Sequence, residues 1–154
     1  MTGKVVNYTH FKKTAARLYA VQALFQMEAS QASATDVANE FEMHRIGAEI
    51  RKIRYNPADT KMFREILNKV VTEQSKIDKL TDNFLKDSWP LNRIDPTLRA
   101  LFRAAIAEIL LEKTPIKAII NEFIDIAKAF FPNGKEAKLV NAVLDNIRTA
   151  HVES

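Results

Sequence analysis

The sequence predicts an all-α fold of about seven helices, arranged as two small bundles that share one core. Three observations support this prediction. Apolar residues recur at spacings of three and four along almost the whole chain, which is the period of an amphipathic helix. No stretch alternates apolar and polar residues with a period of two, as a half-buried strand would. Only three glycines occur in 154 residues, too few for a β-rich fold or a glycine-rich phosphate loop.

Length and composition favour a globular intracellular protein. A chain of 154 residues is one compact domain or two very small ones, and its 47% apolar and 27% charged residues are typical of a folded protein. Cysteine is absent, which suits a reducing compartment. No apolar run approaches the ~20 residues that span a bilayer, and the first ten residues lack the apolar stretch of a signal peptide. We therefore expect a cytoplasmic protein.

The first helix is predicted from about Thr9 to Glu28. Its inward stripe is spaced by three and four residues and consists of Phe11, Ala15, Leu18, Val21, Gln22 and Phe25. Lys13 and Arg17 lie four residues apart on the flank of this stripe, and Lys12 projects elsewhere. The helix is thus expected to be half core and half basic surface.

The next segments are punctuated by polar residues, glycine and proline. A polar linker covers residues 30–35, and a second helix is expected from Thr35 or Asp36 to a stop at Gly47, with Val37, Phe41 and His44 turned inward. The basic stretch at residues 50–55 is interpreted as a loop or one turn of helix. Pro57 suits the first position of a third helix.

A boundary between two bundles is expected near Ser75, with an N-terminal bundle over about residues 9–75 and a C-terminal bundle over about 76–148. Residues 75–78 fit a capping pattern for a further helix. Residues 88–90 read Ser-Trp-Pro and form a tight connector, in which Trp89 is expected to cover the junction between the two bundles.

Clear start and stop signals mark the last three helices. The pairs at residues 95–96 and 114–115 place a side-chain acceptor before a proline, which is typical of a helix start. The Pro-Asn-Gly run at residues 132–134 ends the second of these helices. The final helix is expected to continue to about Arg148.

The net charge of +4 is concentrated at the start of the chain. Residues 1–27 contain Lys4, Lys12, Lys13 and Arg17 and no acidic residue, whereas the remainder has 19 basic and 19 acidic residues. This asymmetry indicates an anionic partner or a solvated helix end. Cations beside an exposed aromatic ring, for which Phe25 or Tyr19 is the candidate, favour single-stranded RNA over a membrane.

The sequence contains no recognisable enzyme motif, so we expect no catalytic residue, metal or cofactor. The three histidines lack a second ligand at metal spacing, and no Gly-x-Ser-x-Gly elbow occurs. Glu122 and Asp125 are interpreted as a solvated face. Glu108 lies at the margin of a buried stripe and is expected to pair with Arg103 or with an arginine on another helix.

Several stretches, taken in order, resemble the bacterial NusB family. Residues 16–25 read ARLYAVQALF and resemble the signature of the family's first helix. Four further matching stretches follow in the same order, at residues 89–95, 98–110, 120–130 and 139–145. The resemblance covers roughly residues 12–147, and the ordered set is far more specific than any one stretch.

The resemblance implies a non-enzymatic, all-helical protein of two packed three-helix bundles. NusB proteins act with NusE, which is also ribosomal protein S-ten, and bind a boxA element in nascent RNA such as ribosomal RNA leaders. The complex helps RNA polymerase to read through terminators, and the C-terminal bundle supplies much of the NusE surface. Carried over by position, the resemblance points to RNA contacts at Lys12, Lys13, Arg17, Phe25, Lys135 and Lys138.

The chain departs from the family pattern in two places. Residues 14–16 interrupt the basic run, and Leu139 stands where the family usually has phenylalanine. Both changes predict weaker intrinsic RNA binding and more reliance on the partner. Two alternatives remain open: an RNA-recognition domain like the front part of some RNA methyltransferases, and a protein–protein adaptor or homodimer without an RNA role.

Overall fold

The structure is a computed structural model. It describes the backbone at residues 2–46, 49–50, 53–54, 57–85 and 90–153, and the side chains at residues 9–46, 57–85 and 90–150. The prediction for Trp89 and the side chain of Lys4 lie outside these ranges.

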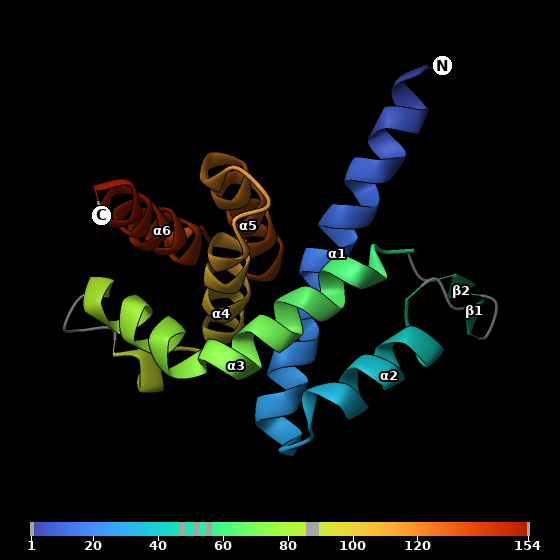
Figure 1. The fold of residues 1–154 in the computed structure, drawn as a ribbon, viewed down its shortest axis with the longest axis horizontal. Coiled ribbons are helices and arrows are strands. Elements are labelled where there is room, and N and C mark those ends of the chain that lie inside the picture. Colours follow the sequence, from blue (N-terminus) through green and yellow to red (C-terminus); the bar gives the residue numbers. More distant parts are fainter. Residues whose placement is uncertain (1, 47–48, 51–52, 55–56, 86–89, 154) are drawn as a thin grey trace.

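The chain forms the all-helical fold that the sequence predicts (Figure 1). In chain order the elements are α1 (Thr2–Ser30), α2 (Ala34–His44), β1 (Glu49–Ile50), β2 (Ile53–Arg54), α3 (Thr60–Phe84), the 3-10 helix η1 (Leu91–Arg93), α4 (Pro96–Leu111), α5 (Ile116–Phe130) and α6 (Lys135–Glu153). The described residues form six α-helices rather than about seven, because the segments on both sides of Ser75 form one helix, α3. The expected break appears as a kink, where Glu73 has the non-helical angles φ −128° and ψ 27°.

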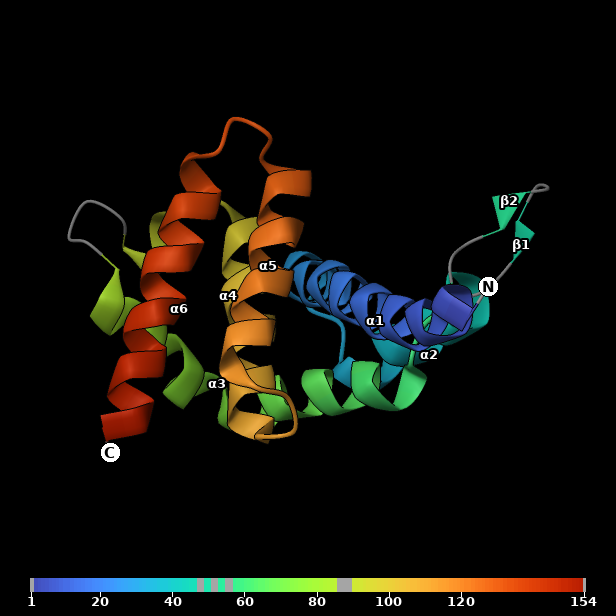
Figure 2. The same ribbon diagram turned by 90° about the horizontal axis from the view of Figure 1, so that it is seen from above.

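Helix α4 lies at the centre of the molecule and packs against α1, α3, α5 and α6. Figure 2 shows α4, α5 and α6 side by side, with α1 and α2 extending to the opposite end. Four alanines of α4 are at most 1% exposed, namely Ala100, Ala104, Ala105 and Ala107. Their small side chains let neighbouring helices approach closely, so α4 is buried almost all round.

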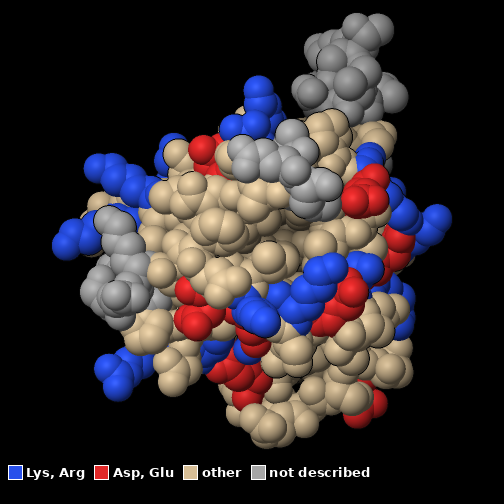
Figure 3. All heavy atoms as spheres, turned by 60° about the vertical axis from the view of Figure 1, so that its left-hand side comes forward, with Lys and Arg blue, Asp and Glu red and all other residues tan. Residues whose placement is uncertain are grey.

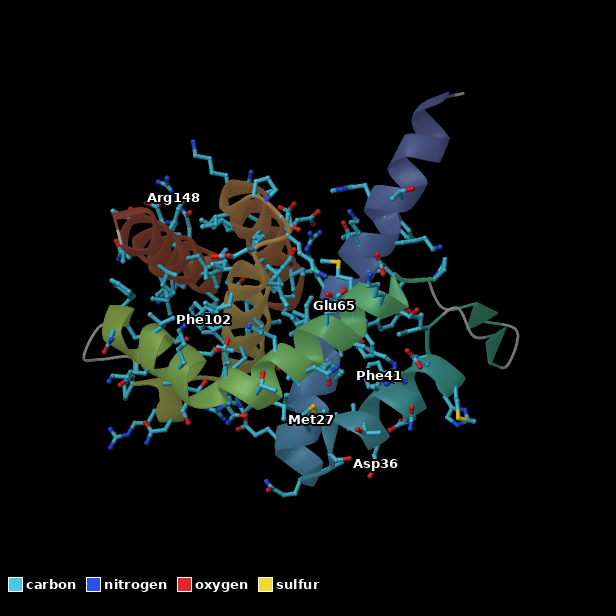
Figure 4. The ribbon with its side chains drawn as sticks, viewed as in Figure 1. Met27, Asp36, Phe41, Glu65, Phe102 and Arg148 are labelled. Atoms are coloured by element: carbon cyan, nitrogen blue, oxygen red, sulfur yellow. The ribbon has the colours of Figure 1, made fainter. Side chains whose placement is uncertain are left out.

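Aromatic rings fill the core beneath α2. Phe41 lies between α2 and α3, as Figure 4 shows, and it is fully buried. Its ring centroid is 5.7 Å from that of Phe63 and 6.2 Å from that of Tyr19. The inward placement of Phe41 is confirmed, whereas His44 is exposed and the expectation for that side chain is wrong.

Side-chain caps fix the starts of three helices. Ser33 accepts a hydrogen bond from the Asp36 amide, Asp59 from the Met62 amide and Asp95 from the Thr97 amide, at 3.1, 3.0 and 2.7 Å respectively. The start signal at residues 95–96 is therefore confirmed, whereas α3 is capped two residues after Pro57. Helix α5 is preceded by Pro115 without a side-chain cap, so the expectation of a Thr114 cap is wrong.

One short segment differs from its prediction, and another agrees with it. Residues 50–55 were expected to form a loop or one helical turn. Instead, strands β1 and β2 pair antiparallel, with Ile50 opposite Ile53. Gly134 ends the α5–α6 connection with φ +87°, a left-handed conformation that glycine adopts at little steric cost, so this stop signal is confirmed.

An ion-pair cluster joins α1, α3 and α4. Glu28 of α1 binds both Arg99 and Arg103 of α4, and Arg103 also binds Asp78 of α3 with a nitrogen–oxygen distance of 2.9 Å. Arg99 additionally donates to the backbone carbonyl of Leu91 at 3.0 Å, which ties the connector before α4 to the same cluster. The hydrogen bond from Arg99 and the charges of both arginines hold the pKa of Glu28 below its usual range, although burial opposes the shift.

The lowered pKa of Glu28 predicts a loss of stability in acid. The folded state favours the charged carboxylate more than the unfolded state does, so this contribution is complete above the ordinary pKa of 4.5 and is lost as the pH falls through the folded pKa. Urea denaturation of the wild type and of Glu28→Gln at a series of pH values tests this. We expect the difference in the free energy of unfolding between the wild type and Glu28→Gln to narrow as the pH falls below about 4.5. A pH-independent gap would contradict the expectation.

Candidate nucleic-acid interface

Arg17 is buried, which corrects its predicted place on the basic flank of the first helix. Its side chain is 3% exposed and makes a bidentate pair with Glu108 of α4, with Nε–Oε1 and Nη2–Oε2 distances of 2.7 and 2.8 Å. A buried charge is costly unless it is paired, and a two-pronged arginine–carboxylate bond supplies that pairing. The expectation that Glu108 pairs with an arginine on another helix is confirmed. Arg17 is therefore not one of the cations that are accessible at the surface.

Glu122 of α5 belongs to the same cluster, so its interpretation as part of a solvated face is wrong. Its side chain is 13% exposed, and its Oε1 atom lies 3.1 Å from Arg17 Nη1 and accepts from the Thr14 hydroxyl at 3.1 Å. His10 Nε2 lies 3.2 Å from the same oxygen. Asp125, by contrast, is exposed as expected.

The three α1 residues that meet Glu122 lie on one helical face. Their spacing of four and three residues places His10, Thr14 and Arg17 one above another along the helix. Sequence reasoning missed this polar stripe because it assigned each cation to the surface individually. The spacing itself was the available signal, since three polar residues in that pattern indicate a common partner.

Two of the predicted cations remain at the surface in the first half of α1. Lys13 is exposed, and Lys12 is half-buried. The backbone carbonyl of Lys12 accepts a hydrogen bond from the Asp59 amide at 3.1 Å, so the start of α3 touches α1 here. Figure 1 shows α1 extending beyond the other helices from this region towards the N-terminus.

Phe25 lies in the second half of α1 and borders a hollow. Its side chain is 41% exposed, and its position is about 20 Å along the helix from Lys12 at ~1.5 Å per residue. The hollow has a volume of about 480 Å³, and its lining includes Phe130 of α5 and Arg45 after α2. An exposed ring beside an apolar hollow can accept a stacked base.

Lys135 and Lys138 are both exposed and occupy the first turn of α6. They follow Phe130 across the connection between α5 and α6, which Figure 2 shows as a loop at one end of the molecule. Leu139 beside them is half-buried and packs against the core. The predicted residues that reach the surface therefore lie in three places: Lys12 and Lys13 in the first half of α1, Phe25 in its second half, and Lys135 and Lys138 in the first turn of α6.

A different face, on the side of α3 and α6, carries mixed charge. A hollow between these helices has an apolar floor that includes Ile106, Ile109 and Ile147, with Lys69, Glu73 and Lys76 at its edge. Figure 3 shows basic and acidic side chains interspersed on this face rather than gathered by sign. Alternating charges of this kind do not attract a phosphate strand as a basic cluster does.

Among the described residues there is neither a group of metal ligands nor a helix fit to span a membrane. No three histidine or acidic side chains there gather in a way that would hold a metal ion. None of the helices over the described residues combines the length and the apolar character that crossing a membrane requires.

The comparison with family models gives one match over most of the chain. The model described as the NusB family matches residues 14–149. Curated relatives named transcription antitermination protein NusB cover 88% of this chain. The protein from Sinorhizobium fredii is 47% identical over 137 residues, which are 85% of its own length. Those from Mesorhizobium japonicum and Agrobacterium fabrum are 45% and 47% identical, over 88% and 82% of their lengths.

Solved structures share the fold. NusB from T. maritima is 30% identical, with a TM-score of 0.68, and the match covers 87% of this chain and 88% of that one. A chain in the structure described as a plectonemic RNA supercoil has a TM-score of 0.73 at 21% identity, covering 92% of this chain and 96% of that one. At that identity the second similarity concerns the fold alone.

Proposed function

The chain belongs to the NusB family, and on that premise we propose that it is a transcription antitermination factor. Together with NusE, which is ribosomal protein S-ten, it binds boxA-type single-stranded RNA in ribosomal RNA leader transcripts. The assembly joins RNA polymerase in the cytoplasm and promotes read-through of terminators. The protein acts as an adaptor rather than as an enzyme. The observation that carries the proposal is the family match over residues 14–149.

The surface near α1 supports RNA as the ligand. Lys12 and Lys13 offer ammonium groups for phosphates, and Phe25 offers an exposed ring beside a hollow. Lys135 and Lys138 add two cations at the start of α6. A strand following α1 would meet the lysines in the first half of the helix and the ring in the second half.

Binding by this chain alone is expected to be weak. Each phosphate contact with single-stranded RNA contributes about −0.7 to the slope of log affinity against log salt. Three or four contacts from the surface lysines therefore give a slope of roughly −2 to −3. Because Arg17 is buried and paired, it supplies no additional phosphate contact. NusE should tighten the complex, since two linked surfaces then hold one RNA.

A mobility-shift titration with a boxA-type RNA tests the proposal. The RNA is titrated across a range of salt concentrations with and without NusE, and a scrambled RNA of equal length serves as the control. We expect tighter binding of the boxA sequence in the presence of NusE. Equal affinity with and without the partner would remove the adaptor role, and equal affinity for the scrambled RNA would remove the boxA preference.

A further inference from the structure

We propose that Glu122 is a positioning residue for RNA capture. One carboxylate oxygen on α5 holds three side chains of α1, and this contact fixes the orientation of the turn that carries Lys12 and Lys13. The inference rests on the proposed function, since it assigns a role to Glu122 within RNA binding.

The geometry centres on a single atom. Glu122 Oε1 lies within 3.2 Å of a nitrogen or hydroxyl oxygen from each of His10, Thr14 and Arg17. These three residues flank Lys12 and Lys13 in the sequence. Rotation of α1 about its axis would break all three contacts together, because they lie on one face.

The side chains of the basic turn are not packed into the core. From Thr9 to Lys13, every described side chain is exposed or half-buried, and Phe11 is 44% exposed. Full burial begins only at Ala15. The Asp59–Lys12 backbone hydrogen bond and the Glu122 contacts are polar tethers that join this turn to the rest of the fold. Arg17 has its bidentate partner in Glu108, so α1 stays anchored farther along without Glu122.

If Glu122 acted only through its charge, its removal would change RNA affinity in the opposite direction from the change expected of a positioning residue. A carboxylate close to a phosphate-binding turn repels the RNA, so its removal should tighten binding if electrostatics were its sole influence. A carboxylate that orders the turn should instead weaken binding when it is removed. The sign of the change therefore separates the two roles.

The experiment compares Glu122→Ala, Glu122→Gln and Asp125→Ala in the boxA titration with NusE present. Glu122→Ala should bind about fivefold more weakly at 0.1 M salt, with a salt slope shallower by about 0.7, as expected for one lost phosphate contact. Glu122→Gln keeps an oxygen at Oε1 and loses only the charge. Its affinity for the boxA RNA should therefore stay within about twofold of that of the wild type. Asp125→Ala removes an exposed carboxylate from the same helix and should leave the slope unchanged.

Two further measurements test whether Glu122 acts through the order of the turn at residues 9–13. Thr14→Val removes one of the three donors and keeps the side-chain shape, so it should weaken binding in the same direction as Glu122→Ala. Amide hydrogen exchange at residues 9–13 should be faster in Glu122→Ala than in wild type, because the turn opens more often.

The outcomes distinguish this proposal from the function on which it rests. Equal tightening by both Glu122 variants overturns the positioning role, as does a weaker Glu122→Ala complex with an unchanged salt slope. A Glu122→Gln complex as weak as the alanine variant also overturns it, because the acceptor would not be sufficient. If wild-type protein with NusE fails to bind boxA RNA, the proposed function itself fails. If substitution of Lys12 and Lys13 abolishes binding while Glu122→Ala does not alter it, only the positioning role fails.

Discussion

Replacing Arg17 with alanine is expected to lower the free energy of unfolding by about 3–5 kcal/mol. The substitution leaves the Glu108 carboxylate, whose side chain is 2% exposed, without its bidentate partner in the core. Removing one member of a buried pair is costly because the other charge stays desolvated. Urea denaturation followed by circular dichroism at neutral pH measures the loss.

Two controls define the origin of this loss. Arg148→Ala breaks the Arg148–Asp145 pair, whose side chains are 32% and 53% exposed, and should cost less than about 1 kcal/mol; Figure 4 labels Arg148 on α6. Replacing Arg17 with Met and Glu108 with Leu together should recover most of the loss, because no buried charge is then stranded. A loss for Arg17→Ala as small as that for Arg148→Ala would contradict the buried-pair interpretation.

Neutralising Lys12 and Lys13 together is expected to weaken boxA binding by roughly 25-fold at 0.1 M salt. Two phosphate contacts at about −0.7 each correspond to a change of 1.4 in the salt slope, and this gives the expected loss at that concentration. The double variant Lys12→Gln/Lys13→Gln should remain folded because neither side chain is fully buried. Mobility-shift titrations across salt concentrations with NusE measure both the affinity and the slope.

The matched control neutralises two lysines elsewhere. Lys76 and Lys79 are both exposed and lie in the second half of α3. The variant Lys76→Gln/Lys79→Gln removes the same net charge and should leave the salt slope unchanged. If both double variants lose affinity equally, net charge rather than local contact explains the binding. Charge reversal at Arg17 would be an unsuitable test, because it would place a glutamate beside Glu108 and Glu122 in the interior.

The candidate site was only partly predictable from the sequence. The exposed positions of Lys13, Lys135 and Lys138 agree with a pattern in which they avoid the inward apolar stripes. Phe11 and Phe25, which the apolar spacing places on the inward stripe of the first helix, are instead 44% and 41% exposed, so the expectation for these two side chains is wrong. Arg17 could not be placed in this way, because helical spacing fixes the angle of a residue around its own helix and not the partner it meets. Its partners lie 91 and 105 positions away along the chain, at Glu108 and Glu122.

The sequence by itself determined most of the helical segments and some of their boundaries. Apolar spacing predicted the helices. The start at Asp95–Pro96 and the break at Gly134 could also be predicted, because caps and left-handed turns depend on a few adjacent residues. Only the tertiary structure decided which polar groups are buried together. Pairing across helices depends on packing distances of a few ångströms between distant segments, and this is why one carboxylate of α5 gathers three side chains of α1.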